Sequence, residues 1–182
     1  MKGHAPERVL WMETQRAWDS PWWRAVGIGG SAAIASPVLW RLFQHCLWGV
    51  RWGGNRMSDP EFAFSLAFTL LMACAVFLLV YFLRMSTEVS PAGVRVVFTP
   101  PGFTVRTVGI GGIRRISVVE YRPIVDYGGW GIRWGLRGRA LSLWGKTGIE
   151  LTLAGGKRLL IGSQRPGQLR DALSRAMKRK GG

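Results

Sequence analysis

The chain has 182 residues and carries 25 Lys or Arg against 10 Asp or Glu, which gives a formal net charge of +15. Its two cysteines form no CxxC pair, so the sequence supports neither a disulfide framework nor a zinc knuckle. The acids are scattered and the C-terminal part has no histidine, a pattern that argues against acid–base catalysis. We therefore expect a protein without enzyme activity, cofactor or metal.

Residues 1–24 mix charges with four tryptophans. Between residues 7 and 18 apolar side chains recur at helical spacing, and tryptophan favours the interface between membrane and water. This pattern predicts an amphipathic helix lying on the membrane surface. A disordered, Trp-rich tail is the alternative.

Residues 25–83 contain two apolar segments. The stretch 62–83 is 22 residues long without a charge, and as a helix it would measure about 33 Å, enough to cross a bilayer core of about 30 Å. The stretch 25–50 is rich in glycine, contains Pro37 and is interrupted by Arg41, Gln44 and His45. Together the two segments predict a transmembrane helical hairpin, with a re-entrant or surface-lying first segment as the alternative.

Small residues indicate how these helices would meet. Gly27, Ser31 and Ala35 are spaced by four, as are Ala63 and Ala67, and small side chains at this spacing let membrane helices approach closely. Residues 51–61 would form a short outer loop. Net charge is +13 from Arg84 onward, so we expect both termini in the cytoplasm of a multi-pass protein of the inner (plasma) membrane.

Residues 84–180 change from helical to alternating periodicity. Apolar and polar residues alternate over 94–98, 103–107 and 149–153, with glycine or proline turns between them. From Pro166 onward apolar residues recur on one face of a helix. The whole chain is thus predicted to be an α+β membrane protein, whose small antiparallel β-barrel or sandwich is capped by a C-terminal amphipathic helix, a pleckstrin-homology-like (PH-like) layout.

The segment 121–133 is the densest motif. Its proline and glycines predict a shaped loop between strands. Such a loop would bring together candidate binding residues that offer aromatic faces and a guanidinium, namely Tyr121, Tyr127, Trp130 and Arg133. In the alternative, Trp130 fills the barrel and Arg133 pairs with Asp126 or Glu120.

This motif and the later run 159–166 (LLIGSQRP) resemble a family of small, uncharacterised prokaryotic membrane proteins. The resemblance covers roughly residues 13–176 and implies a two-helix anchor followed by a PH-like domain. This chain departs from the family pattern at Leu141 and Ser142, where an aromatic residue and an Asn are usual. The family has no established activity.

These observations favour a membrane-anchored binding or scaffold protein whose partner is a protein, an anionic lipid or a second copy of the chain. Each basic residue near an anionic leaflet contributes about 1 kcal/mol of attraction. The candidates for this contact are Arg84, Arg114, Arg115, Arg137, Arg139, Lys157 and Arg158. A small subunit of a larger membrane complex is one alternative. Nucleic-acid binding by the same basic domain is another, although no known recognition motif supports it.

Overall fold

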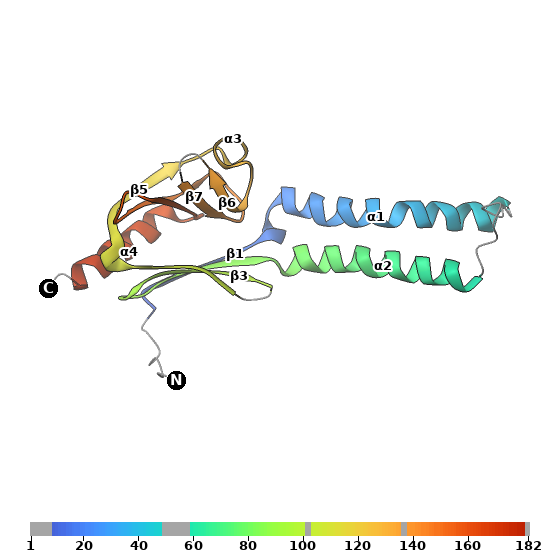
Figure 1. Ribbon diagram of the computed structural model, residues 1–182, viewed down its shortest axis with the longest axis horizontal. Coiled ribbons are helices and arrows are strands. Elements are labelled where there is room, and N and C mark those ends of the chain that lie inside the picture. Colours follow the sequence, from blue (N-terminus) through green and yellow to red (C-terminus); the bar gives the residue numbers. More distant parts are fainter. Residues whose placement is uncertain (1–8, 49–58, 101–102, 136–137, 181–182) are drawn as a thin grey trace. The chain divides into compact units, whose positions relative to one another are not determined.

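The computed structural model describes residues 9–48, 59–100, 103–135 and 138–180. It divides into two compact units. One, the helical unit, is Ala17–Leu83. The other, the β-unit, combines Met1–Arg16 with Arg84–Gly182. The chain therefore leaves the β-unit, forms the helical unit and returns (Figure 1).

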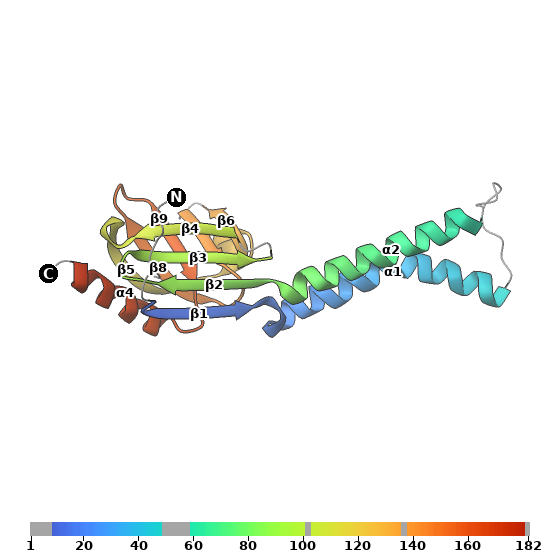
Figure 2. The same cartoon turned by 90° about the horizontal axis from the view of Figure 1, so that it is seen from below.

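The helical unit contains the short 3-10 helix η1 (Ala17–Asp19) and the helices α1 (Pro21–Trp48) and α2 (Asp59–Phe82). Pro21 suits the first position of a helix, where its missing N–H costs nothing. Pro37 lies inside α1, and Figure 2 shows α1 changing direction along its length, as an interior proline predicts. Windows of mean hydropathy 1.3 in α1 and 2.5 in α2 make both helices long and apolar enough to cross a membrane.

The predicted small residues of α1 do meet α2. Gly27 and Ala35 are buried, and a Cβ on Gly27 would lie 3.2 Å from Val80 Cγ1. The Ser31 hydroxyl lies 2.9 Å from the Ala73 carbonyl oxygen of α2 and 2.7 Å from that of Gly27. This part of the prediction is confirmed, because small side chains leave room for such a contact between helices.

The corresponding prediction for α2 is wrong. Ala63 and Ala67 are exposed, whereas Ala73 and Val80 are buried. Spacing by four places residues on one face of a helix but does not say which face meets a neighbour. Here the face that carries Ala73 and Val80 is the one packed against α1.

At its base the helical unit is closed by η1. The Trp18 ring packs edge-on against Phe77 and Tyr81, with ring centroids 5.4 Å away in each case. The Ala17 N–H donates to the Leu83 carbonyl oxygen at 2.9 Å. These contacts join the first and last turns of the hairpin.

The first sheet of the β-unit is antiparallel, with strand order β1-β2-β3-β4 (Figure 2). Its strands are β1 (Trp11–Arg16), β2 (Arg84–Val89), β3 (Gly93–Thr99) and β4 (Phe103–Gly109). The predicted alternation over 94–98 and 103–107 is confirmed as the β3–β4 hairpin. The short 3-10 helix η2 (Ile110–Gly112) follows β4.

The second sheet has the order β5-β8-β9-β7-β6 and is antiparallel except for the β7–β9 pair. Its strands are β5 (Ile113–Glu120), β6 (Gly131–Gly135), β7 (Gly138–Ser142), β8 (Thr147–Leu153) and β9 (Arg158–Gly162), with the short helix α3 (Pro123–Tyr127) between β5 and β6. The β8–β9 hairpin confirms the alternation predicted over 149–153.

Of the two predicted β-architectures, a barrel or a sandwich, the closed barrel does not form. β1 and β4 are the outer strands of one sheet, and β5 and β6 are those of the other, so two separate sheets result. The helix α4 (Pro166–Lys180) contacts β2 and β3 of the first sheet and β5 and β8 of the second (Figure 1). It does so through the predicted apolar face, fully buried at Leu169, Ala172, Leu173 and Ala176.

The predicted interfacial helix is also wrong, because residues 11–16 form strand β1. β1 pairs with β2 in antiparallel register from Trp11 opposite Val89 to Arg16 opposite Arg84. The β-unit therefore begins before the helices and not at residue 84 as expected. The predicted boundary left β1 out of the β-unit. The nearest ends of β1 and β2, Arg16 and Arg84, are 68 residues apart, and strand pairing over such a separation leaves no local signal in the sequence.

Polar side chains explain why β1 escaped detection. Glu13 and Gln15 point inward and are 4% and 3% exposed, where an amphipathic strand would carry apolar residues. Glu13 accepts hydrogen bonds from the Ser163 hydroxyl and, at 2.8 Å, from the Gln164 N–H. The Gln15 amide donates to the Gly162 carbonyl oxygen at 3.0 Å. These bonds tie β1 to the segment that joins β9 to α4.

Candidate anion-binding site

The predicted quartet of binding residues does not converge on one surface. Tyr121 and Tyr127 are only 5% and 7% exposed and pack edge-to-face, with ring centroids 6.1 Å apart. Ala140 and Leu160 complete this cluster, and burial raises the pKa of the Tyr121 hydroxyl. The two tyrosines therefore belong to the core of the β-unit, where their rings are closed to a ligand.

Trp130 lies in the loop between α3 and β6, Arg133 lies in β6, and both bond to backbone within the β-unit. The Trp130 indole N–H donates to the Gly145 carbonyl oxygen at 3.0 Å, and Arg133 Nε donates to the Trp130 carbonyl oxygen at 3.0 Å. Asp126, one expected partner of Arg133, accepts a bond from the Arg122 N–H at 2.8 Å. Gly128 ends α3 in the left-handed region at φ +72°, which a glycine adopts without strain. This loop is held largely by its own hydrogen bonds.

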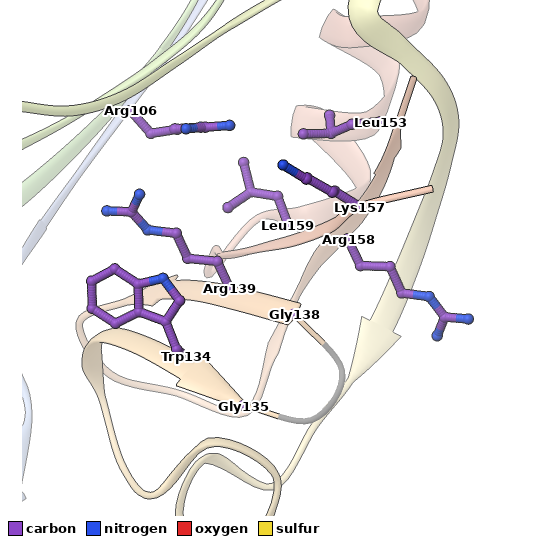
Figure 3. Close-up of a pocket in the computed structure, with 9 residues that line it drawn as sticks. All are labelled: Arg106, Trp134, Gly135, Gly138, Arg139, Leu153, Lys157, Arg158 and Leu159. Atoms are coloured by element: carbon purple, nitrogen blue, oxygen red, sulfur yellow. The ribbon is translucent and has the colours of Figure 1, made fainter. Parts of the chain in front are cut away.

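A different surface gathers positive charge. A pocket of about 320 Å³ lies between the outer strand β4 of the first sheet and strands β6, β7, β8 and β9 of the second (Figure 3). We call it the basic groove. Its lining residues are Arg106, Trp134, Gly135, Gly138, Arg139, Leu153, Lys157, Arg158 and Leu159.

The β6–β7 hairpin builds the floor of the basic groove. Its register places Trp134 directly opposite Arg139, and the Arg139 Cζ atom lies 4.8 Å from the centre of the Trp134 ring. This is a cation–π contact, which fixes the plane of the guanidinium. Gly138 has φ +116° and packs against the Arg158 carbonyl so closely that no side chain would fit. That glycine lets β7 approach β9 and brings Arg139 beside Leu159.

Arg106 and Lys157 form the walls. Both side chains are exposed, and in Figure 3 they extend into the basic groove from opposite sides. Arg158 points away from them, and one of its guanidinium nitrogens lies 3.9 Å from a carboxylate oxygen of Glu150. None of the nine lining residues is acidic. The lining of the basic groove thus holds Arg106, Arg139 and Lys157 and no acidic counter-charge.

Arg139 also keeps an unused donor. Its Nε is buried and makes no hydrogen bond to any residue that the structure describes. A buried guanidinium nitrogen without an acceptor is costly unless another group supplies one. Because Nε is itself buried, an anion in the basic groove would be bound by the terminal nitrogens of this guanidinium.

The other residues expected to touch anionic lipid lie elsewhere. Arg84 begins β2 opposite Arg16, and Arg114 and Arg115 are exposed on β5, whereas Arg137 lies outside the described residues. Of the predicted set, only Arg139, Lys157 and Arg158 line the groove. Leu141 and Ser142, the two departures from the resembled family, are buried in β7.

Sequence reasoning missed Arg106 and Trp134. Arg106 lies on the outer strand of one sheet and Trp134 on the outer strand of the other, so only the packing of the sheets brings them to one pocket. The available signal was modest: Trp134 follows the glycine-rich motif directly and is 73% exposed in the structure. A tryptophan so exposed often marks a binding surface.

The described residues contain no cluster of three His, Cys, Asp or Glu side chains that could hold a metal ion. Comparison with known proteins adds no further assignment. No protein-family model matches the chain, and no curated protein matches it in sequence.

Proposed function

We propose that this protein is a membrane-anchored, non-enzymatic binding protein. In this proposal α1 and α2 span the membrane as a hairpin, and the β-unit lies at the cytoplasmic surface, where it binds an anionic partner. The apolar hairpin and the order of strands followed by one helix support the proposal that the chain is a two-helix anchor with a PH-like domain, as the resemblance described above implies.

The observation that carries the proposal is the pairing of β1 with β2. β1 ends at Arg16, just before the helical unit, and β2 begins at Arg84, just after it, and these two residues are opposite each other in one sheet. Both ends of the hairpin must therefore lie on the same side of any membrane it enters. Two crossings satisfy this condition, whereas a single crossing would separate β1 from β2.

The surface of the helices supports a membrane environment. Only 6% of the residues in the apolar window of α1 and 11% of those in the window of α2 are buried. A core helix of a soluble protein would have most of its apolar side chains covered. α1 and α2, with 28 and 24 residues, are each long enough for a bilayer core of about 30 Å.

Charge supports the cytoplasmic side and the binding role. The +13 net charge from Arg84 onward favours retention in the cytoplasm, and the basic groove gathers part of it in one pocket. Its lining supplies cations and an indole, groups suited to holding an anion. This argues for binding, since proton transfer at neutral pH requires a group with a suitable pKa.

Cysteine labelling of the full chain in whole cells tests the anchoring. With Cys46 and Cys74 replaced by Ala, single cysteines are introduced by Asn55→Cys, between the helices, and by Ala92→Cys, in the exposed β2–β3 turn. An impermeant maleimide should label Asn55→Cys in intact cells and Ala92→Cys only after permeabilisation. Labelling of Ala92→Cys in intact cells, or extraction of the chain from membranes by alkaline carbonate, would overturn the proposal.

A further inference from the structure

We propose that the basic groove binds a phosphate monoester, with Arg106 and Lys157 on either side of the phosphate and Arg139 beneath it. This inference rests on the proposed function, because it names the anion that the β-unit would bind. It is specific in charge and in position: one doubly charged group in one pocket, and not a diffuse attraction over the whole basic surface.

Charge selects this ligand class. A phosphate monoester carries a charge of about −1.5 to −2 at pH 7 and offers three strong acceptor oxygens. A carboxylate or a phosphodiester carries a single negative charge. Arg106, Arg139 and Lys157 have no acidic neighbour in the basic groove, so a doubly charged ligand balances them better than a singly charged one.

Donor geometry supports the same choice. The Arg139 Cζ atom lies 4.8 Å from the centre of the Trp134 ring, and this contact favours one position of the guanidinium in the groove lining. A guanidinium is a rigid fork suited to bidentate contact with phosphate, whereas a Lys ammonium acts as a mobile point charge. Trp134 is therefore a positioning residue, which acts on the ligand through Arg139.

Two sources could present the phosphate. One is a lipid whose head group is a bare monoester, such as phosphatidic acid, and the other is a soluble phosphorylated molecule such as glycerol phosphate. The recognised chemistry is the same for both. A lipid ligand can come only from the membrane that holds the chain. Changing the lipid composition around the protein therefore distinguishes the lipid source from the soluble one.

Lysine labelling of the full chain in nanodiscs provides the test and its internal control. An amine-reactive reagent is applied, and the modification of Lys157 in the basic groove and of exposed Lys178 on α4 is followed in the same sample by mass spectrometry. One arm uses phosphatidylcholine nanodiscs with added glycerol phosphate. The other compares nanodiscs that contain phosphatidic acid with nanodiscs that contain phosphatidylglycerol, a phosphodiester, at equal surface charge.

Phosphate-monoester binding should slow labelling of Lys157 several-fold relative to Lys178 in at least one arm. Protection with phosphatidic acid alone identifies the lipid source, and protection with glycerol phosphate identifies the soluble one. Because the second pKa of a phosphate monoester is about 6, the protection should weaken at pH 5. Arg106→Gln should lower the apparent affinity roughly tenfold or more, since it removes a hydrogen bond between charged groups. Arg175→Gln on α4 should leave it unchanged.

Equal protection of Lys157 and Lys178, or equal protection by phosphatidylglycerol, would show diffuse attraction and overturn the inference. Absence of Lys157 protection in both arms would overturn it as well. Either result leaves the membrane anchoring intact, because cysteine labelling measures that separately. Conversely, an inverted topology in the cysteine experiment would refute the proposed function while the binding measurement still reports on the groove.

Discussion

Two regions of the β-unit combine aromatic rings with arginines, and they behave in opposite ways. The motif 121–133 buries Tyr121 and Tyr127 and satisfies Trp130 and Arg133 with backbone carbonyls. The basic groove leaves Trp134 73% exposed and brings together three cations without a lining acid. A binding surface is recognised by unsatisfied, accessible groups, and composition alone does not distinguish it from a packed loop.

Truncation of the core tyrosine should have the largest effect. Tyr121→Ala removes a ring from a cluster that also holds Tyr127, Ala140 and Leu160. Replacing a buried aromatic residue by Ala costs about 3–5 kcal/mol, because it leaves a cavity. Urea unfolding of the chain in a fixed detergent, followed by its β-sheet signal, should show this loss. A change in unfolding free energy below about 1 kcal/mol would show that Tyr121 lies at the surface and not in the core.

The two neighbouring tryptophans provide a matched pair. Trp130→Ala should lower the unfolding free energy by about 2 kcal/mol, through lost burial and the lost bond to the Gly145 carbonyl. Trp134→Ala should change it by less than about 1 kcal/mol, because that ring is largely exposed and a cation–π contact at an exposed site contributes about 0.5–1 kcal/mol.

Trp130→Ala and Trp134→Ala should also differ in their effect on phosphate binding. Trp134→Ala removes the ring that orients Arg139, and a cation–π contact at an exposed site contributes about 0.5–1 kcal/mol. The apparent affinity for phosphate should therefore fall by a factor of about 2 to 5. Affinity measured through protection of Lys157 checks this. If Trp130→Ala weakened binding more than Trp134→Ala in a folded sample, the motif 121–133 would be the better candidate site.

Charge removal within the groove should affect binding and spare stability. Arg106→Gln with Lys157→Gln removes two exposed charges that face the pocket, so unfolding should shift by less than about 0.5 kcal/mol. Lys157 is replaced in this variant, so its labelling cannot report the loss of phosphate binding. Hydrogen exchange of the backbone amides of β6 and β7 is measured instead. Arg175→Gln with Lys178→Gln removes the same charges from α4 and is the matched control. Equal effects of the two pairs would indicate a long-range field and no specific site.

The smallest effect is expected from Tyr121→Phe at neutral pH. The Tyr121 hydroxyl is buried beside Ser142 and makes no hydrogen bond of regular geometry with it or with another described residue, so its removal should cost little stability. Burial raises the pKa of this hydroxyl, whereas the unfolded chain ionises near pH 10. Above about pH 10 the unfolded state therefore holds fewer protons, and the stability of the parent chain should fall as the pH rises. Tyr121→Phe should remove part of that fall, and identical profiles for the two proteins would contradict the assignment.

Features that depend on neighbours along the chain could be predicted from the amino-acid sequence. Continuous apolar runs specified α1 and α2, alternation specified the β3–β4 and β8–β9 hairpins, and a 3.6-residue period specified the buried face of α4. Each of these patterns repeats within a few residues, so local spacing reveals it without knowledge of the fold.

Which surfaces meet could be known only from the folded protein. β1 pairs with β2 across the whole helical unit and turns Glu13 and Gln15 inward, against the usual preference for apolar residues. Arg106 and Trp134 reach one groove because the outer strands of two sheets come together, and Ala63 and Ala67 stay exposed because α1 packs on another face of α2. Periodicity states which residues share a face, but the partner of that face is chosen by contacts between distant parts of the chain.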